Sequence, residues 1–374
     1  MSLNKIKIFT VVGTRPELIK LSETIKAIDK FFVQVLINTN QNFEYELNKI
    51  FFEELKIRKP DYNFGNEKKK AIEKIADNFI KFEKICIEEK PNAILILGDT
   101  NSTLVTYVAK RYKIPIFHLE AGNRCFDQRV PEEINRKIVD HLSDINLVYS
   151  DIAKSYLLNE GLDPNKIIKV GSPILEVYEK NRIKINKSNI LNKLKIKKKK
   201  YFLISFHREE NLDVENKLKK FIEMLNFLND NYKFDIIISS HYKLMDRLKA
   251  LNYKFNSRKI KFLKPFGYFD YCKLLINSYV VLSDSGTLNE EASIMKFKAL
   301  NLRETHERPE ADEEGTAPLV NMKPSEISNA IDVITKTKPA ETVKDYLVKN
   351  FSEKVVKIIL SFVRKIEREV WKKY

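Results

Sequence analysis

Apolar residues along this chain gather in short continuous runs, and the segments between the runs carry apolar residues at every third or fourth position. In the first half, the runs are residues 7–13, 33–39, 93–98, 114–119 and 145–150, and the segments with helical spacing include 17–31 and 102–112. Continuous apolar strands that alternate with helices are typical of a parallel sheet with both faces covered. The first half therefore predicts a doubly wound α/β domain.

The same alternation starts again in the second half. The apolar runs are residues 200–206, 234–240, 259–265, 279–284 and 297–302, and the helical segments are 216–231, 242–252, 269–278 and 288–295. A polar, Lys-rich stretch separates the two series. We therefore predict an α/β protein with two Rossmann-like, doubly wound domains that face each other across a cleft. The domains are residues 1–172 and 199–374, the second including helices at the C-terminal end, and residues 173–198 connect them.

The composition narrows the kinds of molecule that fit this architecture. With 374 residues, of which 43% are hydrophobic, the chain is long enough for two cores. It has no apolar run of the roughly 20 residues that cross a bilayer. The charged start, MSLNKIKIFTVVG, does not resemble a signal peptide. We therefore expect a cytoplasmic protein without membrane insertion.

The formal net charge of +16 brings nucleic-acid binding into consideration. The lysines, however, are spread along the whole chain, and their densest run, residues 191–200, leads into a strand, where a solvated linker is expected. We expect no nucleic-acid partner, although the charge favours anionic small molecules such as nucleotides. Cys86, Cys125 and Cys272 have neither paired spacing nor a C-x-x-C pattern, so neither a disulfide framework nor a metal site is indicated.

The first candidate site follows the first strand, in GTRPELIK, residues 13–20. Gly13 permits a tight turn, and Pro16 suits the first turn of a helix, whose free N–H groups would form an anion site reinforced by Arg15. The pattern is not G-x-G-x-x-G, so it does not support a dinucleotide cofactor. Lys20 lies one turn further along and faces either the cleft or solvent.

Carboxylates follow neighbouring strands of the first domain. Asp99 follows one strand and Glu120 ends the next, so both should reach the carboxyl edge of the sheet, where α/β proteins bind ligands. An aspartate before a helix is often only a cap. Glu132 and Glu133 begin a helix, where one residue can cap while the other takes part in chemistry.

Several arginines accompany these acids, namely Arg15, Arg124, Arg129 and Arg136. Carboxylates held close together push their pKa values apart, which suits proton transfer. A structural ion-pair network is the rival interpretation of the same residues.

Polar residues also follow the strands of the second domain. The first strand of that domain leads to His207 and Asn211, and a histidine there can act as a general acid or contact a diphosphate. Another strand leads through Asp284, Ser285, Gly286 and Thr287 into a helix N-terminus, which suits a diphosphate. Glu290 or Glu291 would accept hydrogen bonds from ribose hydroxyls, and Arg303, Glu307 and Arg308 follow the next strand towards the same ligand.

Seven ordered motifs resemble one family. GTRPE, GDT, HLEAG, PEEINR, HREEN, SDSG and ERPE occur in the order seen in the non-hydrolysing UDP-N-acetylglucosamine 2-epimerases, and the resemblance covers residues 5–365. Residues 122–141, 207–211 and 300–315 look more like the branch that converts UDP-2-acetamido-2,6-dideoxy-β-L-talose to UDP-N-acetyl-L-fucosamine. The resemblance implies the two-domain glycosyltransferase-B fold, a UDP-binding second domain, a homodimer, and a role in capsule or O-antigen synthesis.

The resemblance also implies a mechanism without metal, nicotinamide or other cofactor. UDP leaves C1 while a base removes the C2 proton, which gives a 2-acetamidoglycal, and UDP adds back after the other face of C2 is protonated. Two faces need differently placed acid/base groups. The matching motifs, with the residues above, predict as catalytic Asp99, Glu120, Glu132 and His207, and as substrate-binding Arg15, Lys20, Arg124, Asn211, Ser285, Gly286, Thr287, Glu291 and Arg308.

Four alternatives make different predictions. A hydrolysing epimerase would release free N-acetylmannosamine and UDP from UDP-N-acetylglucosamine. A glycosyltransferase of the same fold would need an acceptor but not three acids on one side. A nucleotide-sugar sensor would bind UDP and tolerate loss of Asp99 and Glu120. Nucleic-acid binding would depend steeply on salt and hardly on the acids.

Overall fold

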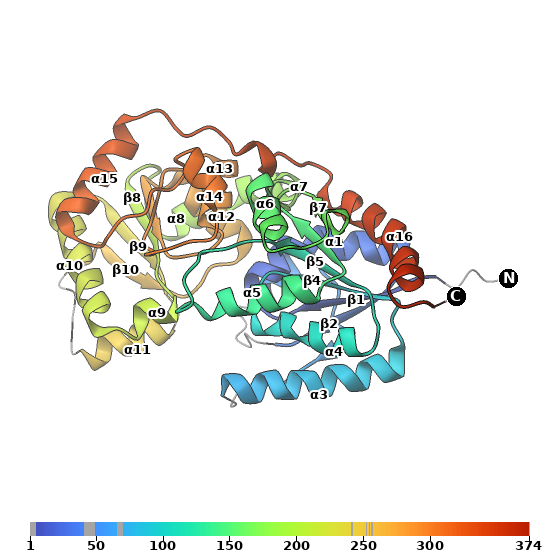
Figure 1. The fold of residues 1–374 in the computed structure, drawn as a ribbon. Coiled ribbons are helices and arrows are strands. Elements are labelled where there is room, and N and C mark those ends of the chain that lie inside the picture. Colours follow the sequence, from blue (N-terminus) through green and yellow to red (C-terminus); the bar gives the residue numbers. More distant parts are fainter. Residues whose placement is uncertain are drawn as a thin grey trace. The chain divides into compact units, whose positions relative to one another are not determined.

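The computed structural model describes residues 5–40, 49–65, 70–240, 242–251, 253, 255 and 257–373. The chain divides into two compact units: unit 1 comprises residues 1–180 and 345–374, and unit 2 comprises residues 181–344 (Figure 1). Each unit is an α/β structure built on its own parallel sheet. The predicted fold class, two parallel-sheet α/β domains, is therefore confirmed.

Unit 1 contains a seven-stranded sheet in which every pairing is parallel. The order is β3-β2-β1-β4-β5-β6-β7. Its strands are β1 (Lys7–Val12), β2 (Val33–Asn38), β3 (Tyr62–Asn63), β4 (Ala93–Leu97), β5 (Ile116–Ala121), β6 (Ile145–Val148) and β7 (Ile167–Lys169). The order reverses between neighbours β1 and β4, and ligands of doubly wound sheets bind at the carboxyl ends of strands at such a point.

The helices of unit 1 follow its strands along the chain. They are α1 (Arg15–Phe31), α2 (Lys49–Glu54), α3 (Ala71–Glu89), α4 (Thr106–Arg111), α5 (Pro131–Leu142), α6 (Asp151–Asn159), α7 (Ile174–Lys187) and α16 (Phe351–Glu369), with short 3-10 turns η2 (Asn101–Val105), η3 (Pro164–Lys166) and η4 (Lys344–Tyr346). The strands bury nearly all their side chains because helices cover them, and Phe9 of β1 meets Phe82 of α3 edge to face with ring centroids 5.9 Å apart.

Unit 2 contains a five-stranded parallel sheet in the order β10-β9-β8-β11-β12. Its strands are β8 (Tyr201–Ser205), β9 (Asp235–Ser239), β10 (Ile260–Leu263), β11 (Val280–Ser283) and β12 (Ala299–Asn301). Its helices are α8 (Ile190–Lys193), α9 (Glu209–Leu212), α10 (Glu215–Asn231), α11 (Tyr242–Ala250), α12 (Tyr268–Asn277), α13 (Leu288–Met295), α14 (Pro309–Glu313) and α15 (Pro324–Lys336). The order reverses between β8 and β11. The helix expected over 242–252 is α11, which ends at Ala250, and residue 252 lies outside the described residues.

The stretch expected to connect the domains is mostly helical. Residues 174–187 form α7, and the division between the units falls inside this helix, after Lys180. The expectation of a polar connection over 173–198 was therefore wrong for its first part. Val177 and Ile185 of α7 are buried, so apolar residues at helical spacing decide the structure despite the many lysines.

The C-terminal boundary of the second domain was also wrong. Residues from Asp345 onwards belong to unit 1, where α16 packs beside α1 (Figure 1). The Ser352 amide and hydroxyl each donate to the Glu176 carboxylate at 2.8 Å, and Asp345 pairs with Lys169 at 2.8 Å. Buried apolar side chains of α16 and these long-range bonds attach the end of the chain to unit 1.

Candidate functional site

In unit 1, the loops that follow β1, β4 and β5 carry the predicted acids and cations. Asp99 follows Gly98 just after the end of β4, and Glu120 is the penultimate residue of β5. The two carboxylates therefore come from neighbouring strands. The loop after β1 belongs to the third neighbouring strand. The structure therefore brings the residues from these motifs to one edge of the sheet, as the sequence predicted.

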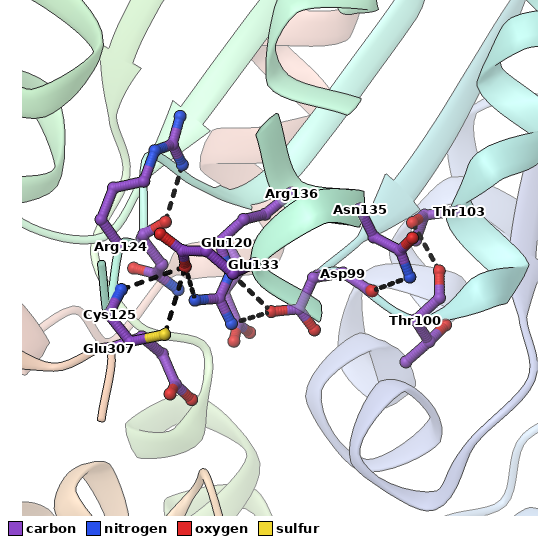
Figure 2. A network of polar contacts seen from close by, with 12 residues as sticks. Asp99, Thr100, Thr103, Glu120, Arg124, Cys125, Glu133, Asn135, Arg136 and Glu307 are labelled. Atoms are coloured by element: carbon purple, nitrogen blue, oxygen red, sulfur yellow. Dashed lines mark hydrogen bonds and ion pairs between the residues drawn. The ribbon is translucent and has the colours of Figure 1, made fainter. Parts of the chain in front are cut away.

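Arg136 of α5 holds the side chain of Asp99. Its Nη2 and Nε donate to Oδ2 of Asp99 at 2.6 and 3.0 Å, and its Nη1 donates to Glu133 at 2.6 Å, so the guanidinium lies between the two carboxylates (Figure 2). Asn135 also donates to the backbone carbonyl of Asp99 at 2.9 Å. Asp99 is therefore fixed from α5, and the cap of the following turn, η2, is Thr100 rather than Asp99.

Glu120 sits at an irregularity in β5. Its φ is 68°, and the register between β5 and β6 shifts between Leu119 and Ala121. A left-handed residue at such a bulge turns its side chain away from the direction that the regular strand would give. The Glu120 carboxylate accepts a bond from Nζ of Lys20 at 2.6 Å, and Nζ lies 5.6 Å from the Tyr149 ring centroid.

This contact answers the question that the sequence left open for Lys20. The lysine side chain is 3% exposed and points towards Glu120 rather than into solvent. Burial of a charged pair requires a direct partner. The strand bulge and the helix after β1 thus place a carboxylate and an ammonium group together.

Glu132 and Glu133, at the start of α5, differ in their surroundings. The Glu133 side chain is 1% exposed and accepts bonds from the amides of Cys125 and Phe126, both at 3.1 Å. Burial opposes its ionisation, but the Cys125 amide and Arg136 outweigh burial and lower its pKa. Glu133 therefore supports the preceding loop, whereas Glu132 is only half-buried.

The two amides that precede the anion site predicted at the start of α1 are bonded within the protein. The amides of Gly13 and Thr14 donate to Oε2 of Glu17 at 2.5 and 3.3 Å. Because a carboxylate already accepts from these two N–H groups, they are not free to bind an anion, and the first-turn N–H groups of α1 stay the predicted anion site. Arg15, at the first position of α1, is half-buried.

Arg124, predicted to contact substrate, is enclosed by carboxylates of the protein. Its side chain has 0% exposure. Nε and Nη2 donate to Glu160 at 2.7 and 2.6 Å, and Nη1 donates to Asp140 at 2.7 Å. A fully buried guanidinium with a carboxylate on each side fixes the loop after β5.

Asp140 also receives contacts from His118 and Gly122. Nδ1 of His118 lies 2.9 Å from its carboxylate, and the Gly122 amide donates to it at 3.2 Å. Burial opposes ionisation of Asp140, but His118 and then Arg124 outweigh it and lower the pKa. The rival interpretation of an ion-pair network therefore holds for Arg124, whereas Arg129 is exposed and pairs locally with Asp127.

In unit 2, Asp284 organises the loop after β8. Its buried carboxylate accepts from the amides of His207 and Arg208 at 3.1 and 3.0 Å, and lies 3.1 Å from Nδ1 of His207. Burial opposes ionisation, but His207, the Arg208 amide and Asn211 lower the pKa of Asp284 to about 2. His207 has a 39% exposed side chain, so a ligand can reach its ring.

Asn211 was predicted to contact substrate, but its amide nitrogen donates to Asp284 at 3.0 Å and the residue is buried. It therefore supports the loop that carries His207. In this loop His207 is therefore accessible to a ligand, whereas Asn211 and Asp284 are buried and hold the loop in place.

The Ser285–Thr287 turn lies at the other strand of this switch point, after β11. The hydroxyls of Ser285 and Thr287 lie 3.1 Å apart. A Cβ atom at Gly286 would lie 3.0 Å from Oε1 of Glu307 and 3.3 Å from Nη2 of Arg208, so a glycine leaves room beside charged groups. Thr287 has a φ of −88°, an ordinary value that a non-glycine residue tolerates.

The remaining predicted residues of unit 2 lie at α13 and before α14. Arg308 is 1% exposed and its Nη2 donates to Oε1 of Glu290 at 2.9 Å, so Glu290 holds this arginine. Glu291 is buried, 6% exposed. Arg303 donates to Glu307 at 2.8 Å. Of the two glutamates that the sequence left open, Glu290 is engaged by Arg308.

Some supporting residues were not among the predicted site residues. Glu17 and Asp284 accept from loop amides, Asp140 anchors Arg124, and Nδ1 of His306 accepts from the Arg308 amide at 3.1 Å. A signal for Glu17 was present, because T-x-x-E before a helix is the capping-box pattern. The pairing of Arg124 with Asp140 and Glu160 has no local pattern.

Two further kinds of feature were considered for the described residues, a metal site and a membrane-spanning helix. Among them, no group of three or more His, Cys, Asp and Glu side chains is arranged to hold a metal ion. Within the same residues, no helix combines the length and apolar character that crossing a bilayer requires.

Comparisons with known proteins agree with the motifs. A family model described as UDP-N-acetylglucosamine 2-epimerase matches residues 25–360. The UDP-N-acetylglucosamine 2-epimerase of Methanocaldococcus jannaschii is 38% identical over 343 residues, covering 89% of this chain and 93% of the relative.

Two solved structures are similar over almost the whole chain. The UDP-N-acetylglucosamine 2-epimerase from Rickettsia bellii has a TM-score of 0.93 and 45% identity, covering 99% of this chain and 100% of that chain. The M. jannaschii UDP-GlcNAc 2-epimerase in complex with UDP-GlcNAc and UDP has a TM-score of 0.89 and 35% identity, covering 95% and 100%. The extent of these matches shows that the chain belongs to the UDP-N-acetylglucosamine 2-epimerase family.

Proposed function

We propose that this protein inverts C2 of a UDP-2-acetamido sugar by eliminating UDP and adding it back. The observation that carries the proposal is that Asp99 and Glu120 end neighbouring strands, each against a buried cation, Arg136 or Lys20. Family membership supplies the reaction class. Carboxylates held in place at a ligand-binding edge are suited to general acid–base catalysis.

The chemistry explains why several acids are needed. The C2 proton of the sugar is not beside a carbonyl, so its removal alone is too unfavourable. In the proposed reaction a carboxylate takes that proton, the C1–O bond breaks, and the bonding electrons leave with UDP. A carboxylic acid on the other face then protonates C2, and a diphosphate oxygen attacks C1. We propose that Asp99, Glu120 and Glu132 supply these groups.

The UDP part of the substrate needs donors for its phosphates and acceptors for its ribose. We propose that Ser285, Gly286 and Thr287 bind the diphosphate through hydroxyls and backbone N–H groups, with His207 as a further donor or general acid. Other residues proposed to contact substrate are Arg15 and Lys20 at the diphosphate, Glu291 at the ribose, and Arg308 at the nucleotide. Arg124 and Asn211 support their loops instead, because both are buried and bonded to carboxylates.

Two substrates fit this reaction. Motif resemblance supports UDP-2-acetamido-2,6-dideoxy-β-L-talose, the precursor of UDP-N-acetyl-L-fucosamine, and with it capsule or O-antigen synthesis in the cytoplasm. The names of the similar proteins support UDP-N-acetylglucosamine. Both are UDP-2-acetamido sugars that differ at other carbons, so the same C2 chemistry serves either. The resemblance also leads us to propose a homodimer, which light scattering would test.

The deciding experiment is incubation with each sugar nucleotide in deuterium oxide, followed by NMR at C2. Deuterium at C2 with formation of the C2 epimer supports the proposed reaction, and the sugar that exchanges identifies the substrate. Free N-acetylmannosamine with stoichiometric UDP would instead identify a hydrolysing enzyme. Failure of both nucleotides to exchange would contradict epimerisation. Asp99→Asn should abolish exchange in the active case.

A further inference from the structure

Glu17 joins the loops that follow β1 and β4. Its Oε2 accepts from the amides of Gly13 and Thr14, and its Oε1 accepts from the Thr100 hydroxyl at 2.6 Å. Thr100 directly follows Asp99 in the chain. One carboxylate thus connects two neighbouring strand ends at the switch point of unit 1.

The Glu17 contact is enclosed by tightly packed side chains. Glu17 is 2% exposed. Beside it, a Cβ atom at Gly13 would overlap Oγ of Ser102 and Oγ1 of Thr39, and these two hydroxyls lie 2.7 Å apart. The space beside Gly13 is filled, so we expect a change in the Glu17 bonds to move the residues that they join.

The Thr100 hydroxyl has a defined direction. It donates to Glu17, and it accepts from the Ser102 amide at 3.3 Å as the cap of η2. With its hydrogen committed to Glu17, the hydroxyl oxygen remains available to the amide. Glu17 therefore determines how the turn that carries Asp99 begins.

We propose that Glu17 is a positioning residue for the reaction, which sets the place of Asp99 through the Thr100 hydroxyl. This inference rests on the proposed function. Glu17 itself need not touch the substrate, because it acts through the loop. Arg136 fixes the Asp99 side chain from α5, and Glu17 fixes the backbone that carries it.

Above its pKa of about 7, Glu17 is a carboxylate that only accepts, and glutamine cannot reproduce this arrangement. If its oxygen accepts from the Gly13 and Thr14 amides, its NH2 group faces the Thr100 hydroxyl, which must then accept and loses the acceptor of its own hydrogen. If the amide is reversed, its NH2 group faces two N–H donors. The substitution nevertheless preserves size and shape, so it tests the bonds without opening a cavity.

The experiment compares Glu17→Gln, Thr100→Val and Thr100→Ser with the wild type above pH 7, where Glu17 is ionised. We expect Glu17→Gln and Thr100→Val each to lower kcat by about 10- to 100-fold, the effect of misplacing a reacting group by about 1 Å or less. KM should stay within about twofold, because the Ser285–Thr287 turn proposed to bind the diphosphate is unchanged. Thr100→Ser retains the hydroxyl and should keep nearly the wild-type kcat. The double variant Glu17→Gln/Thr100→Val should be no slower than either single variant.

Glu23→Gln is the matched control. Glu23 is also a buried glutamate of α1, 7% exposed, but pairs with Lys26 at 2.7 Å instead of joining the two loops. Its kcat should equal that of the wild type. A wild-type kcat for Glu17→Gln, a loss that only follows the fraction of unfolded protein, or an equal loss in Thr100→Ser and Thr100→Val would overturn the proposal.

A second measurement separates this proposal from the proposed function. If the wild type epimerises neither UDP-sugar, the function fails, and hydrogen exchange of the Gly13 and Thr14 amides still tests the loop contact. Exchange should be faster in Glu17→Gln than in Glu23→Gln. Equal exchange would overturn the link between Glu17 and the loop regardless of activity.

Discussion

At the residue scale, the two candidate acids at the strand ends of unit 1 each have a cation fixed beside them. Lys20 lies 2.6 Å from Glu120, and Arg136 lies 2.6 Å from Asp99. The cations fix the direction of each carboxylate, and such fixed groups suit the acid–base role proposed for them. A substitution of similar shape can therefore remove the charge of either carboxylate while the neighbouring residues stay the same.

Glu120→Gln should reduce kcat by orders of magnitude while UDP affinity stays near that of the wild type. The substitution removes a proton-transfer group but keeps the shape of the side chain beside Lys20. Turnover and calorimetric titration with UDP measure the two effects. Glu88→Gln, a change at an exposed pair with Lys84, is the control. An unchanged kcat for Glu120→Gln would exclude an acid/base role.

Glu17 should also make stability depend on pH. Burial, opposed by its bonds to Thr100, Gly13 and Thr14, raises its pKa from 4.5 to about 7. The folded state therefore binds this proton more tightly than the unfolded state, so the stability contribution is present below pH 4.5 and is lost as pH rises through about 7. The difference corresponds to about 3 kcal/mol.

Denaturation between pH 5 and 8 measures this contribution. Wild type should lose about 3 kcal/mol relative to Glu17→Gln over that interval. The only tryptophan of the chain, Trp371, lies in unit 1 with Nζ of Lys110 5.2 Å from its ring centroid, so its fluorescence reports unfolding of the relevant unit. A constant difference between the two proteins across this range would contradict the raised pKa.

At the element scale, buried charges connect the end of β5 to the helices around it. Arg124 follows β5, Asp140 lies on α5, and Glu160 ends α6, so one guanidinium joins three elements. His118 of β5 lies against the same Asp140. The position of Glu120 within β5 therefore depends on residues that need not contact substrate.

Arg124→Met should mainly affect stability. It leaves Asp140 without its arginine in the interior, and breaking a buried pair in this way costs about 3–5 kcal/mol. Denaturation followed by Trp371 fluorescence measures the loss, and KM at a temperature where the variant is folded should change by less than about threefold. A large increase in KM without destabilisation would restore Arg124 as a substrate contact.

The sequence predicted elements better than the contacts between them. All of the expected strands formed, because each is a continuous apolar run in a sheet covered by helices. The strands β3 and β7 were missed because two and three residues carry no periodicity. The motifs located the loops of the site, but the partners of Lys20 and Arg124 lie 100 and 36 residues away, where no local pattern indicates them.

At the whole-molecule scale, the chain leaves unit 1 inside α7 and returns near Asp345. The sequence did not reveal this return. The amphipathic pattern of the C-terminal helix indicates that one face is buried, but it does not indicate which of the two domains covers that face. The C-terminal helix, α16, packs against α1, the helix that carries Glu17 and Lys20. The end of the chain therefore supports the helix on which part of the candidate site is built.

Deletion of residues 345–374 should unfold unit 1 before unit 2. Buried apolar residues of α16 would be lost, namely Phe351, Val355, Val356, Ile359, Val363 and Ile366. Their burial contributes on the order of 10 kcal/mol, which is comparable to the stability of a whole domain. Limited proteolysis with mass spectrometry should therefore find early cleavage in residues 5–180 and a protected unit 2.

Deletion of residues 370–374 alone, after α16, is the control and should leave unit 1 resistant. Equal resistance of both deletions would show that α16 does not stabilise unit 1, and early cleavage confined to residues 181–344 would assign the helix to the other unit.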